Sequence, residues 1–340
     1  MGQRFLLAFA NQGFVPPVMD KGLVTRWSLD GGNWSDRIPI EGQSTKFAPA
    51  LVDAPGFRIV VAYVANNDTN EILITRRSSL TGGDWTDSVG AGGQRSKTAP
   101  AMAVFRDELF MAYVSNDDRN MLMLHSTKNL VEWSKPVFTE QATKFAPALL
   151  TWGAELVLAY VDNSDTFELR TMSSTDGVNW TAPRPVEGQS SFAGPALDWY
   201  GGGKLIMVYV AANDSHDLLT TTSHDGITWS DSRLVEGQFG AQQANNAPAI
   251  LGGDPLRMIY TDVGGGLRPT ISGDGGINWT NPGVIGAIWG KTGLESCDAS
   301  DSGVAFSHRW WSDFYWPSTL AFPRDAHRLE QRQNVPDKVE

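Results

Sequence analysis

The sequence predicts an all-β fold, a six-bladed β-propeller with four antiparallel strands in each blade. Three markers recur in phase along the 340 residues and carry this prediction. The first is a tryptophan that follows a turn once in each unit: Trp34, Trp85, Trp133, Trp180, Trp229 and Trp279. Successive tryptophans lie about 49 residues apart, close to the repeat length of propeller blades.

The other two markers keep the same spacing. A motif of small residues around a proline marks the predicted inner strand of five units, with the proline at Pro49, Pro100, Pro147, Pro195 and Pro248. An aromatic residue marks the second strand of each unit: Phe9, Tyr63, Tyr113, Tyr160, Tyr209 and Tyr260. Small residues suit an inner strand because blades crowd together near the axis, and proline is tolerated at a sheet edge.

The clearest unit, residues 144–189, contains the four strands expected in one blade. Its segments alternate apolar and polar residues, which predicts half-buried strands. The segment Thr175–Asn179 predicts a tight turn, because Asp and Gly favour reversal of the chain. A single sheet of this kind would leave its edges and one face uncovered. Radial packing of several sheets covers both faces, which favours a propeller.

The phase of the repeat also predicts how the ring closes. The blades are expected at residues 1–43, 44–94, 95–141, 142–189, 190–238 and 239–286. The chain begins in a second strand, at residues 4–10, so the first blade lacks an inner strand. We expect the C-terminal segment to supply this strand, near residues 296–303. An irregular seventh blade from residues 285–322 is the alternative.

The composition bounds the domain organisation and the possible partners. We expect a single domain over residues 1–322 and a polar tail over residues 323–340, because the repeat covers nearly the whole chain. The net charge of −11 argues against nucleic acid or an anionic membrane as a partner. No apolar run is long enough for a membrane span, and no signal-peptide core is found. The expected location is cytoplasmic, or outside the cell by a route that needs no signal peptide.

Cysteine and histidine usage predicts neither a disulfide nor a metal site. Cys297 is the only cysteine, so an intrachain disulfide cannot form. The five histidines show no metal-ligand spacing. We therefore expect no metal and no cofactor.

The turn before the tryptophan carries the motif Ser-x-Asp-Gly-x-x-Trp in three units: Ser28–Trp34, Ser174–Trp180 and Ser223–Trp229. This motif resembles the Asp box, or BNR repeat, of sialidase-like propellers. Two other copies carry Thr81 and Asn129 in place of the aspartate, and a third, Ser272–Trp279, is one residue longer. The resemblance implies a sialidase-like propeller, and the repetition of the blades leads us to expect a lectin-like, non-enzymatic member of that family. The motif's carboxylates are expected to accept hydrogen bonds from turn amides.

A sialidase-like glycoside hydrolase is the alternative function that the resemblance raises. It implies three arginines on a substrate carboxylate, a Tyr–Glu nucleophile pair and an acidic aspartate. The segment Asp36–Pro39 contains the family's Arg-Ile-Pro motif, but it follows the first box and does not precede it. Most tyrosines belong to the blade repeat, which leaves Tyr315 as the candidate nucleophile. We therefore name no catalytic residue and favour binding over catalysis.

The favoured function is carbohydrate binding through repeated weak sites on one face, with glycans or glycoconjugates as partners. The loops after the second strands and the segments entering the next blade share a face and carry recurring polar residues. The candidate ligand-binding residues are Gln43, Lys46, Asn66, Asp68, Gln94, Lys97, Asn116, Asp118, Gln141, Lys144, Asn163, Asp165, Gln189 and Asp214. Their amide, carboxylate and ammonium groups suit sugar hydroxyls. Repetition favours multivalent binding. A protein-interaction platform is a second alternative.

Overall fold

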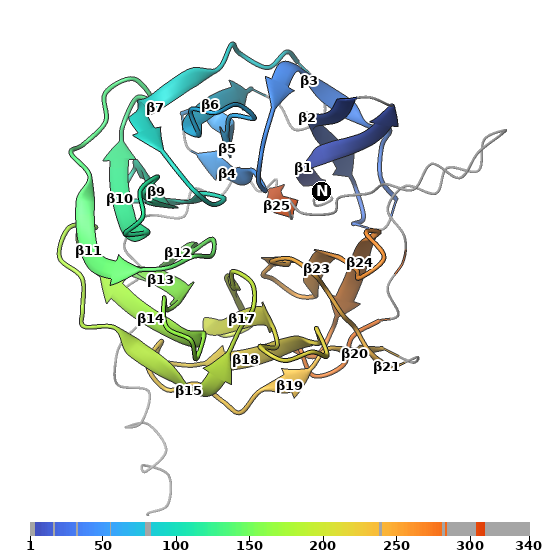
Figure 1. Cartoon of the computed structure of the whole chain (residues 1–340). Helices are drawn as coiled ribbons and strands as arrows, with labels where there is room; N and C mark the ends of the chain where they lie inside the picture. The colour runs from blue at the N-terminus through green and yellow to red at the C-terminus, as the bar shows by residue number, and fades with distance from the viewer. Residues whose placement is uncertain are drawn as a thin grey trace, which may run out of the picture.

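The computed structural model describes residues 4–15, 18–31, 33–54, 56–78, 83–237, 240–280, 283 and 304–309. These residues form six antiparallel blade sheets that are arranged radially around an axis, together with one two-stranded ribbon (Figure 1). The prediction of a six-bladed propeller is confirmed. The predicted tail at residues 323–340 lies outside the described residues.

Blades one to three each contain four strands. Blade one consists of β25 (Val304–Arg309), β1 (Arg4–Val15), β2 (Val18–Ser28) and β3 (Ile38–Ser44). Blade two consists of β4 (Ala50–Ala54), β5 (Arg58–Val64), β6 (Glu71–Arg77) and β7 (Val89–Arg95). Blade three consists of β8 (Ala101–Phe105), β9 (Glu108–Val114), β10 (Met121–Thr127) and β11 (Val137–Ala142).

The remaining blades follow the same order from the axis outward. Blade four consists of β12 (Ala148–Trp152), β13 (Glu155–Val161), β14 (Glu168–Ser174) and β15 (Arg184–Ser190). Blade five consists of β16 (Ala196–Tyr200), β17 (Lys204–Val210), β18 (Leu218–Ser223) and β19 (Arg233–Leu234). Blade six contains β22 (Ala249–Leu251), β23 (Leu256–Thr261) and β24 (Leu267–Ser272) within the described residues. A short ribbon of β20 (Glu236–Gly237) and β21 (Gly240–Ala241) lies between the last two blades in the sequence.

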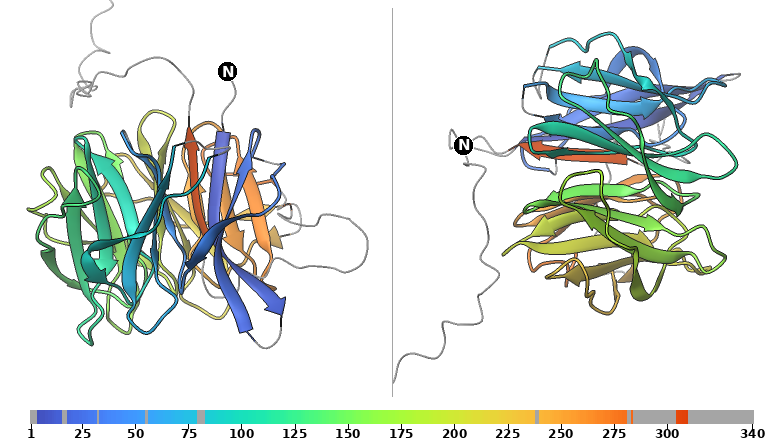
Figure 2. Two further views of the ribbon diagram at one scale, coloured as in Figure 1. Left: turned by 90° about the horizontal axis from the view of Figure 1, so that it is seen from above. Right: turned by 90° about the vertical axis from the view of Figure 1, so that its left-hand side faces the viewer.

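The ring is closed by pairing between the two ends of the chain. Strand β25 pairs antiparallel with β1, from Arg4 opposite Arg309 to Phe9 opposite Val304. Figure 2 shows β25 beside β1. The expected closure by the C-terminal segment is confirmed, and the closing strand lies slightly later than the predicted residues 296–303. The alternative of a seventh blade is wrong, because this segment completes blade one.

The second strands form the centre of the core. In β9, β13 and β17 every residue after the first is buried. Neighbouring blades cover both faces of these strands, so they read as nearly continuous apolar runs. The expectation of alternating, half-buried strands therefore fails for them. It holds better at the outer strands, where in β3 only Ile40 is buried.

The turns before the tryptophans are held together by their own side chains. In blade four, Asp176 Oδ1 accepts hydrogen bonds from the backbone N–H groups of Val178 at 2.8 Å and Asn179 at 2.7 Å. In blade three, Asn129 Oδ1 accepts the corresponding bonds from Val131 at 2.9 Å and Glu132 at 2.8 Å. The structural role predicted for the motif's aspartate is confirmed at Asp176, and Asn129 serves the same turn where it replaces the aspartate. Among the described residues, no helix has the length and apolarity needed to cross a bilayer.

Candidate functional site

One face of the propeller brings together the two kinds of loop that carry the candidate residues. We call it the connection face: the segments entering each blade's inner strand and the loops after the second strands. In blade two, Lys46 N donates to Val64 O at 3.0 Å, and Asn66 N donates to Ser44 O at 3.1 Å. In blade five, Phe192 N donates to Val210 O at 3.2 Å. Repeated backbone hydrogen bonds therefore join these loops, which confirms the prediction that they share a face.

The four candidate glutamines lie at the ends of outer strands and bind tyrosines of the next blade. The Tyr63 hydroxyl donates to Gln43 Oε1. The same bond joins Tyr113 to Gln94 at 2.6 Å, Tyr160 to Gln141 at 3.0 Å and Tyr209 to Gln189 at 2.8 Å. Burial raises the pKa of Tyr209 to about 12, so the phenol keeps its proton. These glutamine oxygens are already occupied in joining blades.

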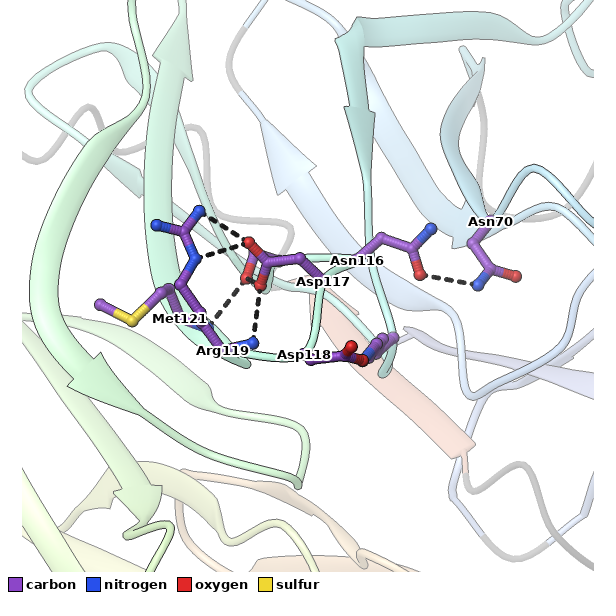
Figure 3. Close-up of polar contacts among 8 residues, drawn as sticks. Asn70, Asn116, Asp117, Asp118, Arg119 and Met121 are labelled. Atoms are coloured by element: carbon purple, nitrogen blue, oxygen red, sulfur yellow. Dashed lines mark hydrogen bonds and ion pairs between the residues drawn. The ribbon is translucent and has the colours of Figure 1, made fainter.

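Four further candidates take part in contacts around blades two and three, and two of them, Asn116 and Asp118, are labelled in Figure 3. Lys46 Nζ donates to Asn70 Oδ1 at 2.6 Å, and Asn70 Nδ2 donates to Asn116 Oδ1 at 2.9 Å. Lys97 Nζ and Asp118 Oδ1 form an ion pair at 3.3 Å. The Asp118 side chain is fully exposed, and an exposed pair of this kind contributes only about 0–1 kcal/mol.

The other six candidates are exposed on the connection face. They are Asn66, Asp68, Lys144, Asn163, Asp165 and Asp214. No hydrogen bond or ion pair joins their side chains to another residue within the described ranges. They therefore present carboxylate, amide and ammonium groups to solvent from several blades.

The shape of these loops is set by the residue just before the exposed aspartate. Asn67 Oδ1 accepts hydrogen bonds from Thr69 N at 3.0 Å and Thr69 Oγ1 at 2.6 Å. Asp117 fills the same place and binds Ser115 and Arg119. The bonds from Ser115 and Arg119 lower the pKa of Asp117 to about 2. The neighbours Asp68 and Asp118 are therefore not needed to hold the turns.

The structure also reveals two partly buried arginine clusters that the sequence reasoning missed. Arg170 lies 3.2 Å from Asp162 and 2.6 Å from Glu168, and Arg268 lies 2.5 Å from Asp262. Both arginines pair with the blade tyrosine across the sheet. Alignment of the blades would have identified them, because the corresponding residues elsewhere are apolar: Leu73, Met123 and Leu219.

An aromatic cluster at the junction of blades four and five was also missed. The ring centroids of Phe145 and Phe167 are 6.1 Å apart, and those of Phe167 and Phe192 are 5.2 Å apart. Phe192 stands where Lys46 and Lys97 stand in blades two and three. A comparison of these entering segments would have identified the exchange of lysine for an aromatic residue.

The described part of the chain contains no group of His, Cys, Asp and Glu side chains arranged to hold a metal ion. Tyr315, the candidate nucleophile of the alternative function, lies outside the described residues. Within them, the exposed polar groups of the connection face and the aromatic cluster are the features suited to ligand contact.

The comparisons with known proteins establish the fold. No family model and no curated protein matches the sequence. Among solved structures, the Aleuria aurantia lectin is similar, with a TM-score of 0.56 and 14% identity over 79% of this chain and 90% of that chain. AofleA from Arthrobotrys oligospora has a TM-score of 0.58 and 11% identity, over 85% and 83% of the chains. A protein of unknown function from Dyadobacter fermentans has a TM-score of 0.55 and 12% identity, over 83% and 90%.

These similarities correct the family expected from the turn motif. The first of these structures is described as a fungal lectin with a six-bladed propeller and a fucose recognition mode. The prediction of an Asp-box, sialidase-like family is wrong. The motif misled because its Ser and Asp side chains satisfy the amides of a tight hairpin, and any propeller with such hairpins gains from the same residues. The motif therefore reports local turn geometry.

Proposed function

We propose that this protein binds carbohydrate through repeated sites on the connection face, with glycans or glycoconjugates as its partners. The observation that carries the proposal is that the polar residues of this face fall into two sets with different contacts. One set, including Gln189 and Asn116, joins the blades. A second set, including Asp68, Asp165 and Asp214, is exposed and has no partner among the described residues.

The chemistry of the second set suits neutral sugars. A carboxylate accepts hydrogen bonds from two adjacent hydroxyl groups, and an amide both donates and accepts. Asn163 and Asp165 offer this combination from one loop of blade four, and Asn66 and Asp68 offer it from blade two. The excess of carboxylates, within a chain of net charge −11, disfavours anionic ligands.

The repetition of these groups suits weak, multivalent binding. A shallow site with a Kd of about 1 mM corresponds to about −4 kcal/mol. Several such sites on one face raise the avidity for a branched glycan by about 10²–10⁴-fold without any new contact. An enzyme would instead need one constellation that is distinct from its repeats.

The similar structures support the choice of a first probe. The Aleuria aurantia lectin has been solved with α-methyl-L-fucoside and with a fucose-containing disaccharide. A mutant of AofleA that lacks three arginines has also been solved. Because the identities are 14% or less, fucose enters here as a probe for this chain and its arginines are given no role by analogy.

The proposal is tested by glycan-array binding followed by titration of the strongest ligand. We expect Asp165→Ala to reduce the array signal severalfold. The matched control is Asp231→Ala, which removes an exposed carboxylate beside the turns on the opposite face. Binding to no glycan at millimolar concentration would overturn the proposal. Binding to a glycoprotein that free sugar does not compete for would indicate a protein-interaction platform.

A further inference from the structure

The junction between blades four and five differs from the polar junction between blades two and three. We call Phe145, Phe167 and Phe192 the aromatic junction. Phe167 meets both of its neighbours edge to face, with interplanar angles of 70° and 75°. Edge-to-face contact is a favourable arrangement for aromatic rings and holds them in fixed orientations.

Two of these rings replace polar residues at matching backbone positions. Phe192 N donates to Val210 O at 3.2 Å, as Lys97 N donates to Val114 O at 3.1 Å. Phe167 has a φ of 52°, and Asn70 has a φ of 53° at the same place in blade two. There, the Asn70 side chain bonds to Asn116 (Figure 3) and to Lys46, so both ends of its amide group have partners. The aromatic junction has no such chain of side-chain bonds, so its outer ring stays available for a ligand.

The ring that remains accessible is that of Phe192, which is 37% exposed. Phe145 and Phe167 are partly buried against the core between β13 and β17. Among the described residues, Phe192 is the exposed aromatic side chain on the connection face. A rigid, half-exposed ring of this kind offers a flat apolar surface with little conformational entropy left to lose.

Exposed polar groups lie in the loops of blades four and five that neighbour this ring. Asp214 follows β17 at the position where Asp118 follows β9, and Asp118 reaches the entering residue Lys97 at 3.3 Å. Asp214 therefore occupies the loop position equivalent to the one that meets the entering residue in blade three, and a backbone bond from Ala212 N to Ser190 O at 3.2 Å joins its loop to the segment that carries Phe192. Asn163 and Asp165 lie in the same loop as Phe167. All three are exposed and have no side-chain partner within the described ranges.

We propose that the aromatic junction is the principal carbohydrate subsite of the connection face and that it takes a neutral sugar ring. This inference rests on the proposed function and sharpens it. The C–H face of the sugar lies against Phe192, and its hydroxyl groups bind Asp214 on one side and Asn163 or Asp165 on the other. Acidic sugars are disfavoured, because the exposed carboxylates of Asp165 and Asp214 outnumber the one exposed ammonium group of these loops, that of Lys144.

The test compares Phe192→Lys with the wild-type protein. Lysine stands at this place in blades two and three, so the substitution is compatible with the fold. The matched control is Phe138→Lys, which replaces an exposed phenylalanine on the outer strand β11. Phe192→Leu is a second variant that keeps an apolar contact with Phe167 but removes the ring.

Binding is measured by saturation-transfer NMR and titration with methyl glycosides of fucose, galactose and mannose, and with N-acetylneuraminic acid. We expect the best neutral glycoside to bind about tenfold more weakly to both Phe192 variants, as loss of about 1.4 kcal/mol predicts. Phe138→Lys should bind like the wild type, and N-acetylneuraminic acid should not bind.

The possible outcomes separate this inference from the proposed function. If the wild type binds a neutral glycoside and both Phe192 variants retain the same affinity, the subsite lies elsewhere and the inference is overturned while carbohydrate binding stands. Strong binding of N-acetylneuraminic acid would also overturn it. If the wild type binds no sugar at all, the proposed function itself fails.

Discussion

Tyr209 of blade five donates a hydrogen bond from its phenol to Oε1 of Gln189 in blade four, at 2.8 Å. Gln189 Nε2 in turn donates to Ser230 O at 2.9 Å, across the same junction. The amide group therefore uses both of its ends to join two blades. Both residues are buried, so if one is removed the polar group of the other cannot form a hydrogen bond with water instead.

We expect Tyr209→Phe to lower the free energy of unfolding by about 1–2 kcal/mol, because it leaves the buried Gln189 oxygen without its donor. Urea denaturation would measure the change. The matched control is a double-mutant cycle with Gln189→Ala, which isolates the coupling between the two side chains. A coupling energy close to zero would contradict the structural role assigned to this pair.

The burial of His125 in blade three is expected to make the stability of the protein depend on pH. It is 1% exposed, neither ring nitrogen has a hydrogen-bond partner in the described structure, and the ring stacks on Trp133 at 4.2 Å. Burial lowers the pKa of His125 to about 4, against about 6.5 in an unfolded chain. Above pH 6.5 the imidazole is neutral in both states. As the pH falls towards 4, only the unfolded state gains the proton, so stability decreases by about 3 kcal/mol.

The variant His125→Thr tests this assignment. Threonine stands at the equivalent place in blade two, where Thr75 Oγ1 donates to Thr86 O at 2.7 Å. We expect the variant to show a flatter dependence of the unfolding free energy on pH between about 4 and 6.5. The comparison with the wild type removes the contribution of the carboxyl groups common to both. An unchanged slope would show that His125 titrates normally in the folded state.

Gly177 packs so closely on blade three that no larger side chain fits at this position. Its φ is +76°, and an added Cβ would overlap the ring of Phe110. Gly188 is the matched control, because its φ is +69° but an added Cβ meets nothing within 4 Å. We expect Gly188→Ala to cost about 1 kcal/mol through backbone strain alone. Gly177→Ala should cost about 1–3 kcal/mol more through overpacking. Equal melting temperatures for the two variants would rule out the contact with Phe110.

The closing strand predicts two different outcomes for C-terminal truncation. Ending the chain after residue 303 removes β25 and leaves β1 with an unpaired edge, which favours association through that edge. We expect loss of a cooperative unfolding transition and the appearance of oligomers in size-exclusion chromatography. Ending the chain after residue 322 should change neither property, because we propose that the domain ends there. Identical behaviour of the two truncations would contradict the closure.

The repeated markers made the ring and its closure predictable because they report packing that every blade shares. Tyr160 and Tyr209 are needed at the same depth in each blade, so their spacing reveals the period. The roles of the candidate glutamines were harder to predict from the sequence. Gln141 and Gln189 bind tyrosines 19 and 20 residues further along, and this nearly constant separation could have indicated a bond between blades in place of a ligand contact.

The aromatic junction could not be predicted from any single segment. Phe167 and Phe192 lie in different blades, and each looks like an isolated departure from the repeat. Only the register of the entering segments brings them within 5.2 Å of each other. The arginine clusters could not be predicted for a similar reason. Arg170 pairs with Asp162 across a loop whose conformation depends on local side-chain hydrogen bonds. Contacts between repeats require knowledge of their relative placement.

The pairing of Arg4 with Arg309 has a consequence for the biosynthesis of this protein. A ribosome makes Arg309 long after Arg4, because 304 residues separate the two in the chain. During that interval blade one has no inner strand, and the edge of β1 is open to any extended chain nearby. The native ring can therefore form only after β25 has been made and has left the ribosome, and chaperones that cover β1 until then should raise the yield of folded protein.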